Sequence, residues 1–460
     1  MAAILQMGEQ RAAETTETVE QSRAPQKWTA LVAALAFAAL SIGTWLEFLR
    51  PNWPMYWHQV DLQVYMWGGS TAALHPELLY DGRGPMNLPF LYPVFAAWIC
   101  AQLARFPINY IGTGIVILTV ASLFASVWSA AALQRYRRGI GMIAMTITVG
   151  AAAIWIEPVQ QTFQFGQLSV ILMALVLADL AIPKDRRYRG ILIGIATSLK
   201  LTPAVFIVYL LITRQFRAAG VATATFATTV AIGFWYLPTQ ALEFWSTTTS
   251  SQNRIGFGYV QNQSINGLFG RLQWTTWEHN EAWLVGAGLL AIAGIAAARV
   301  AYLRGDELLG ALLAATVMLL ASPISWTHYW VWIAPAMIWL FQALRSRPLG
   351  VRIAVPAVIY LFIFAWPMQV DRIGTWDTTL PVLPQGLIWF VPQTMGREFH
   401  WTLAQFFLGN SYTLLATAAL VAAIVYLLPR NPRTPHSALP ESTLAATDLP
   451  AGVGARSSAE

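Results

Sequence analysis

Apolar residues gather in long runs along the chain, separated by short polar or basic segments. Runs of spanning length lie near 28–49, 108–133, 140–156, 166–182, 217–237, 284–303, 307–321, 329–344, 352–368 and 410–428. A helix needs about 20 apolar residues to cross the hydrocarbon core of a bilayer. Because backbone groups in lipid must pair within their own segment, these runs predict helices and an all-α transmembrane bundle.

Two further apolar segments do not fit a simple crossing. Residues 190–213 carry basic clusters at both ends, and Lys200 and Pro203 lie at their middle. Two half-helices meeting at 200–203 fit this pattern, because broken backbone at membrane depth is tolerated where it lines a cavity. Residues 91–104 are short and precede Arg105, which favours a re-entrant segment. We therefore expect about twelve membrane segments.

The composition excludes a water-soluble globule. The 460 residues are 56% hydrophobic and 11% charged, whereas soluble domains carry about 25% charged residues. The net charge of +6 comes from Lys and Arg in short clusters between apolar runs. That distribution sets membrane topology and does not predict nucleic-acid binding.

The basic clusters predict which ends of the helices face the cytoplasm. They are Arg135, Arg137 and Arg138; Lys184, Arg186, Arg187 and Arg189; Arg214 and Arg217; Arg304; Arg345, Arg347 and Arg352; and Arg430 with Arg433. The other side then receives 50–90, 157–165, 238–283, 322–328 and 369–409. We expect a multi-pass inner (plasma) membrane protein with one domain at 28–430. The polar tails 1–27 and 431–460 are expected to be disordered and cytoplasmic. The lone Cys100 permits no intrachain disulfide.

The first outside segment contains the acid Asp61 beside Trp57 and His58. A carboxyl group in an aromatic setting near the interface can have its pKa raised enough to accept a proton near neutral pH. The alternative is that Asp61 caps a helix over 62–74. The sequence does not separate these two interpretations.

An amide-rich segment follows the third apolar run, with Glu157, Gln160, Gln161, Gln164 and Gln167. Amides suit hydroxyl-rich ligands because they both donate and accept hydrogen bonds. They also join helices to one another inside membrane bundles. Both roles remain open. Nearby turn sequences at 79–82 and 90–93 are interpreted as structural.

Cations and a histidine supply candidate anion-binding groups. An ammonium inside an apolar run, such as Lys200, is expected to have a functional anion partner. Arg254 precedes an amide-rich run at 259–267 that could bind sugar hydroxyls and phosphate, or could be a solvated loop. His328 follows the Pro323 turn beside Trp326, where it could hydrogen-bond a phosphate or serve structure alone.

Taken in order, these motifs resemble glycosyltransferase family 87 of the GT-C membrane superfamily. They are Asp61-Leu-x-Val-Tyr65, Gly166-Gln167, Lys200-Leu-Thr-Pro203, Asn262-Gln-Ser-Ile265 and Ser322-Pro-Ile-Ser-Trp-x-His328. The resemblance covers residues 28–430. Within the family the chain is most similar to members that add α-1,2-linked mannose to phosphatidylinositol mannosides.

The resemblance implies an inverting transfer from a polyprenyl-phosphate-linked sugar donor to a glycolipid acceptor. Asp61 matches the base that removes the proton of the acceptor hydroxyl, and His328, Lys200 and Arg254 match groups at the donor phosphate. The residues expected to bind the sugar and the acceptor are His58, Tyr65, Gln167, Asn262, Gln263 and Trp326. Membrane lipid is an expected partner. No metal, cofactor, nucleic acid or obligate protein partner is expected.

Two alternatives remain at this stage. A close relative in the same family could use polyprenyl-phosphate-arabinofuranose instead of the mannose donor. A lipid flippase or transporter, which performs no chemistry, would also have broken helices and an intramembrane cation. In such a protein we expect charged residues on both sides of the transport pathway and a sequence repeat between the two halves of the chain. Here the candidate site residues lie on one side of the membrane.

Overall fold

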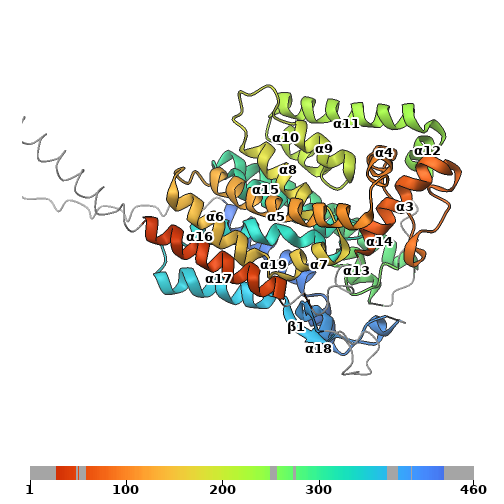
Figure 1. Cartoon of the computed structure of the whole chain (residues 1–460). Helices are drawn as coiled ribbons and strands as arrows, with labels where there is room; N and C mark the ends of the chain where they lie inside the picture. The colour runs from red at the N-terminus through yellow and green to blue at the C-terminus, as the bar shows by residue number, and fades with distance from the viewer. Residues whose placement is uncertain are drawn as a thin grey trace, which may run out of the picture. The chain divides into compact units, whose positions relative to one another are not determined.

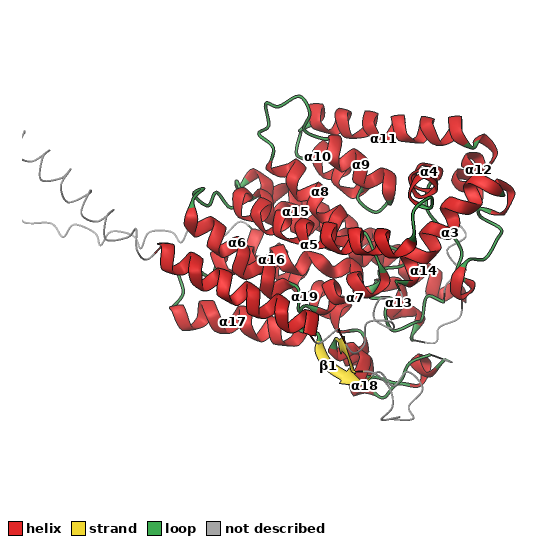
Figure 2. Ribbon diagram, viewed as in Figure 1, coloured by secondary structure: helices red, strands yellow, loops and turns green. Residues whose placement is uncertain are grey.

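The computed structural model describes residues 27–47, 50, 59–248, 256–272, 276–369, 382–394 and 396–428. Within these ranges the chain is almost entirely helical (Figures 1 and 2). The described β structure is a two-stranded antiparallel sheet, in which β1 (Trp366–Gln369) pairs with β2 (Val382–Gln385), and two isolated bridges. The prediction of an all-α architecture is confirmed for this part of the chain.

Four described helices are long and apolar enough to cross a membrane. They are Lys27–Glu47, α5 (Ile108–Leu133), α11 (Phe216–Tyr236) and the segment Asn280–Leu303 of α14 (Thr276–Leu303). Two bent pairs could each form one more span. They are α7 (Glu157–Phe165) with α8 (Ser169–Ala181), at 117°, and α18 (Leu403–Gly409) with α19 (Ser411–Leu427), at 70°. The count is thus four to six by length and composition.

Shorter helices occupy most of the other predicted runs. They are α4 (Val94–Leu103), α6 (Ile140–Ala153), α15 (Glu307–Ala321), α16 (Ile333–Ala343) and α17 (Leu349–Ile363). Residues 157–165, which the basic clusters place outside, form helix α7 with Pro158 in its first turn. Proline is favoured there because the first helical N–H groups have no intrahelical partner.

The run at 190–213 is divided as the sequence predicts. Helix α9 (Ile191–Leu199) ends before Lys200, whose backbone is extended, and α10 (Ala204–Ile212) begins after Pro203. Proline lacks a backbone N–H and disfavours helical backbone in the residue before it. The break therefore follows directly from the local sequence.

The N-terminus of α9 is held by a buried acid from α8. Asp179 accepts hydrogen bonds from the backbone N–H groups of Gly190, Leu192 and Ile193 at 2.7, 2.8 and 3.2 Å. These bonds satisfy donors that a helix leaves unpaired at its start. Beside them, Arg189 forms an ion pair with Glu307 at 2.5 Å, which ties this corner to α15.

The helix that carries Asp61, α3 (Val60–Leu74), packs closely on α4. At Gly69 an added Cβ would lie 2.3 Å from the carbonyl carbon of Cys100, and at Gly68 it would lie 2.2 Å from the Phe90 ring. Without side chains at these positions, α3 packs at Gly69 directly against the backbone of α4, and at Gly68 against the ring of Phe90, which precedes α4. In Figure 1, α3, α4 and α12 (Pro238–Glu243) lie together at one end of α11.

Short elements complete the described structure. They are η2 (Pro76–Leu78), η3 (Pro85–Asn87), the π-helical turn η4 (Phe244–Thr248), α13 (Ile265–Gly270), η6 (Thr327–Trp332), η7 (Leu387–Phe390) and η8 (Arg397–His400).

Candidate active site

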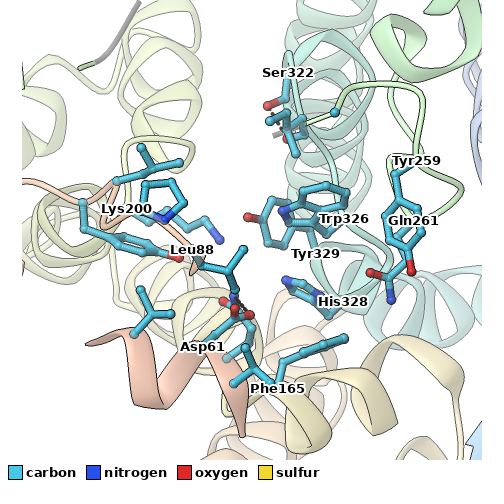
Figure 3. A pocket seen from close by; sticks show the side chains of 18 of the residues that line it. Asp61, Leu88, Phe165, Lys200, Tyr259, Gln261, Ser322, Trp326, His328 and Tyr329 are labelled. Atoms are coloured by element: carbon cyan, nitrogen blue, oxygen red, sulfur yellow. Dashed lines mark hydrogen bonds between the residues drawn. The ribbon is translucent and has the colours of Figure 1, made fainter. Parts of the chain in front are cut away.

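A cavity of about 680 Å³ lies among these short elements, and six predicted site residues line it. They are Asp61, Tyr65, Gln167, Lys200, Trp326 and His328. They come from segments far apart in sequence: α3, the α7–α8 corner, the α9–α10 break and the residues at and before η6. Figure 3 shows Asp61, Lys200 and His328 around the same space. The volume is in the range of small-molecule binding sites.

Asp61 lies in the first turn of α3, outside the candidate spans, and its carboxylate is tied to Gln167. The Gln167 Nε2 donates to Asp61 Oδ2 at 2.5 Å. This is the carboxylate's described hydrogen bond, so the structure favours a cavity role over helix capping. Burial raises the pKa of Asp61 to about 6, while the Gln167 bond and the charge of Lys200 act to lower it. Such a carboxylate is ionised at neutral pH and is a stronger base than an ordinary aspartate.

The amide of Gln167 is engaged at both ends. Its Oε1 accepts from the Tyr65 hydroxyl at 3.0 Å, and that hydroxyl lies 3.0 Å from the hydroxyl of Tyr92. Because an ionised carboxylate can only accept, the NH₂ group must face Asp61, and the amide oxygen then faces the Tyr65 hydroxyl. Tyr65 and Gln167 therefore position the carboxylate. Sequence reasoning missed Tyr92, because its motif looked like a simple turn before α4.

The ammonium of Lys200 sits against aromatic rings at the α9–α10 break. Its Nζ is 3.5 Å from the centroid of the Tyr329 ring and 6.0 Å from that of Tyr92. Electron-rich ring faces stabilise a cation without neutralising it. Among the described residues, no acid forms an ion pair with Lys200 within 4.0 Å, so its charge is available to an anion in the cavity. Tyr329 also escaped sequence reasoning.

His328 is buried in η6, and neither ring nitrogen has a hydrogen-bond partner among the described residues. Its ring packs between Phe165 and Tyr329. Burial and the charge of Lys200 hold the pKa of His328 well below its usual range. The imidazole is thus neutral, with one donor and one acceptor nitrogen. Since buried polar groups normally find partners, a ligand in the cavity is the expected one.

The predicted sugar-binding residues Asn262 and Gln263 do not line the cavity. Asn262 donates to the carbonyls of Phe257 and Pro323 and accepts from the Ser325 backbone N–H. Gln263 donates to the carbonyls of Val260 and Gly409. Their contacts hold the loops around the cavity together, and sugar binding by them stays a prediction.

The residue of this amide run that does line the cavity is Gln261, beside Tyr259 (Figure 3). His58 and Arg254, also predicted for the site, lie outside the described residues.

The amides at 160–161 are used between structural elements. Gln160 donates to the Ile154 carbonyl and accepts from the Trp45 indole, while Gln161 donates to Gln385 in β2. Glu157 accepts from the Tyr412 hydroxyl at 2.8 Å and from the Trp389 indole at 3.3 Å. These contacts favour the joining of helices over ligand binding for this segment. Within the described residues, no three His, Cys, Asp or Glu side chains gather as a metal site would require.

The sequence was compared with known proteins. The model of glycosyltransferase family 87 matches residues 90–323. A protein of Mycobacterium tuberculosis, the polyprenol-phosphate-mannose-dependent alpha-(1-2)-phosphatidylinositol mannoside mannosyltransferase, is 31% identical over 376 residues, which cover 76% of this chain and 84% of the relative.

A second relative comes from Mycolicibacterium smegmatis. This polyprenol-phosphate-mannose-dependent alpha-(1-2)-phosphatidylinositol pentamannoside mannosyltransferase is 35% identical over 316 residues, which cover 66% of this chain and 74% of the relative. No solved structure matches the chain significantly. The match to the family model and the share of the chain that these relatives cover confirm the resemblance seen in the motifs. The chain belongs to glycosyltransferase family 87 and is a membrane glycosyltransferase.

Proposed function

We propose that the protein transfers mannose from polyprenyl-phosphate-mannose to a glycolipid of the phosphatidylinositol mannoside type, with Asp61 as the general base. The functions by which the relatives are named support this donor and acceptor. The observation that carries the chemistry is that one cavity brings together a basic carboxylate, an ammonium and a neutral imidazole. Among the described residues, the ammonium has no ion-pair partner and the imidazole has no hydrogen-bond partner.

The proposed reaction is a single displacement. Asp61 takes the proton of the acceptor hydroxyl as that oxygen attacks the anomeric carbon, and the carbon–oxygen bond to the phosphate breaks with its electron pair going to the phosphate. A β-linked donor then gives an α-linked product. Since Oδ2 accepts from Gln167, Oδ1 is the oxygen free to receive the proton.

The departing phosphate is proposed to lie between Lys200 and His328. The phosphate gains negative charge in the transition state, so a fixed cation there stabilises that state more than the bound donor. The neutral imidazole of His328 offers an N–H donor to a phosphate oxygen. The aromatic wall around Lys200 keeps the ammonium in place without pairing it with an acid of the protein.

We further propose a GT-C-type bundle of about twelve membrane segments over residues 28–430. Both termini face the cytoplasm, and the cavity opens to the extracytoplasmic side of the inner membrane. The support is the charge pattern: apart from the Lys200–Thr202 break and Gln167, the cavity residues fall in or beside segments that the basic clusters place outside.

The test is the Asp61→Asn variant of the full-length protein, purified and placed in lipid. It is incubated with a synthetic mannosyl donor and a glycolipid acceptor, and the products are identified by mass spectrometry. Asparagine still offers an oxygen to Gln167 but cannot take the proton. We expect turnover to fall by about a hundred- to ten-thousand-fold, while binding of the donor persists.

The exposed acid Asp81 provides the matched control, because Asp81→Asn removes a carboxylate of the same size outside the cavity. Full turnover by Asp61→Asn would reject Asp61 as the base. A parallel reaction with polyprenyl-phosphate-arabinofuranose tests the sugar, since faster transfer from that donor would contradict the mannose assignment.

A further inference from the structure

A second carboxylate, Glu398, lines the same cavity. It lies in η8, is 4% exposed and accepts a hydrogen bond from the Thr394 backbone N–H through Oε1 at 2.7 Å. No described residue donates a hydrogen bond to its other oxygen, Oε2. This oxygen is not one of the fully buried side-chain atoms that lack a partner, so it is accessible to a ligand. Since Glu398 lines the cavity, this oxygen is the one with hydrogen-bonding capacity left for a ligand there.

A cation of the protein interacts with Glu398 electrostatically. Arg271 is buried, and its guanidinium donates to Asn410 Oδ1 at 3.0 and 2.6 Å and to the Tyr259 and Asn262 carbonyls. Glu398 and Arg271 attract each other, and this attraction opposes the burial that lowers the Arg271 pKa to about 9. The two do not form an ion pair within 4.0 Å among the described contacts, so the carboxylate remains free for a ligand.

Glu398 belongs to the wall opposite Lys200. Its segment packs on the loop at 256–261, where the Tyr259 hydroxyl donates to Gln393 at 3.5 Å and the Phe399 ring fills the space beside Gly258. Figure 3 shows Tyr259 and Gln261 on the far side of the cavity from Lys200. The cavity thus has a cationic wall and, across from it, a wall with a carboxylate and an amide.

These two walls select different chemical groups. A phosphate is attracted by Lys200 and repelled by Glu398. Neutral sugar hydroxyls suit Glu398, because a carboxylate oxygen accepts from O–H donors in short, charge-assisted bonds. Gln261, which also lines the cavity, adds an amide that both donates and accepts.

We propose that Glu398 binds the acceptor, by accepting hydrogen bonds from hydroxyls of its sugar headgroup through Oε2. This inference rests on the proposed function for the identity of the acceptor. It assigns the wall formed by the 256–261 and 396–399 segments to the acceptor and the Lys200 side to the donor.

The test is Glu398→Gln in the full-length protein in lipid nanodiscs, with two separate readouts. The first is equilibrium binding of a phosphatidylinositol mannoside without donor, and the second is steady-state transfer with each substrate varied. Glutamine can keep the Thr394 bond and so preserve the loop, while its NH₂ group replaces the accepting oxygen in the cavity. We expect acceptor binding to weaken about tenfold, the loss expected for one charge-assisted hydrogen bond. The KM for the acceptor should rise accordingly, and that for the donor should stay unchanged.

The exposed acid Glu77 supplies the control, since Glu77→Gln should change neither constant. Unchanged acceptor binding in Glu398→Gln, or a rise in donor KM alone, would overturn the acceptor assignment. If the wild-type protein binds the glycolipid but transfers no mannose, the proposed function fails, and the binding difference between wild type and Glu398→Gln still decides whether Glu398 recognises the headgroup.

Discussion

The carboxamide of Gln167 controls how basic Asp61 is. It donates to the carboxylate that we propose as the base, and a hydrogen bond to the ionised form lowers a pKa. Because the base must be deprotonated to act, activity should be present above its pKa and should be lost as the pH falls through it. For the wild-type protein we predict an acid limb in kcat/KM near pH 6.

Gln167→Leu should move this acid limb to higher pH. Burial raises the pKa of Asp61 and the Gln167 hydrogen bond lowers it, so removing the donor raises the pKa further. The expected rise is about one unit if the bond is worth about 1.4 kcal/mol. The measurement is the pH profile of kcat/KM, with Gln102→Leu on α4 as a control outside the cavity. A lower rate with an unmoved limb would show that Gln167 serves structure only.

At Lys200 the shape of the cation should matter as well as its charge. The ammonium fits against the Tyr329 ring at 3.5 Å, where a planar guanidinium cannot take the same position. We predict that Lys200→Arg retains less than about half of the activity and that Lys200→Met loses far more.

The measurement is kcat and donor KM, and Lys184→Met, at an exposed lysine, should leave both unchanged. Complete rescue by arginine would contradict a compact phosphate site.

His328 should be needed for turnover but not for folding. His328→Ala removes the buried imidazole, and no hydrogen bond to a described residue is lost with it. We expect turnover to fall about a hundredfold, the lower range for a positioned donor in the transition state, with normal yield of purified protein. Unchanged transfer would show that the donor phosphate lies elsewhere.

At the scale of elements, Asp179 is predicted to be essential for stability and not for catalysis. Asp179→Ala would leave three N–H groups at the start of α9 without their acceptor, at about 1–3 kcal/mol for a buried unsatisfied group. We expect a lower unfolding temperature in detergent, followed by tryptophan fluorescence, with transfer intact at low temperature. The exposed Asp185 is the control, since Asp185→Ala should unfold like the wild type. Equal stability of both variants would contradict the capping role.

The elements themselves were largely readable from sequence. The run at 108–133 became α5 and Pro203 marked the α9–α10 break, because apolar length and proline act locally. The roles of Asn262 and Gln261 were not readable in this way. Both lie in one polar run, and only the loop geometry decides that Gln261 faces the cavity while Asn262 bonds Pro323 and Ser325.

The same holds for Glu398, Tyr92 and Tyr329, which no motif distinguished from ordinary loop or helix residues. Their importance arises from tertiary contacts with Asp61, Lys200 or the cavity.

At the scale of the whole molecule, the orientation in the membrane can be tested by cysteine labelling. Cys100 is the single native cysteine, so a Cys100→Ser background allows new cysteines to be placed one at a time. Arg83 and Arg187 are both exposed. We predict that a membrane-impermeant maleimide labels Arg83→Cys in intact spheroplasts, whereas Arg187→Cys reacts only after permeabilisation. The reverse pattern would place the cavity on the cytoplasmic side.

The contact between α3 and α4 at Gly69 limits how this enzyme can diversify. The backbone at Gly69 already lies so close to that of Cys100 that an added Cβ would be 2.3 Å from its carbonyl carbon. The helix that carries the base therefore has no room to move toward α4 and admit a bulkier substrate. New acceptor preferences must therefore arise on the facing loops, at 256–261 and 396–399. Family members that differ in the glycolipid they extend should vary in length and side chains at those loops, while the glycine and the acid stay fixed.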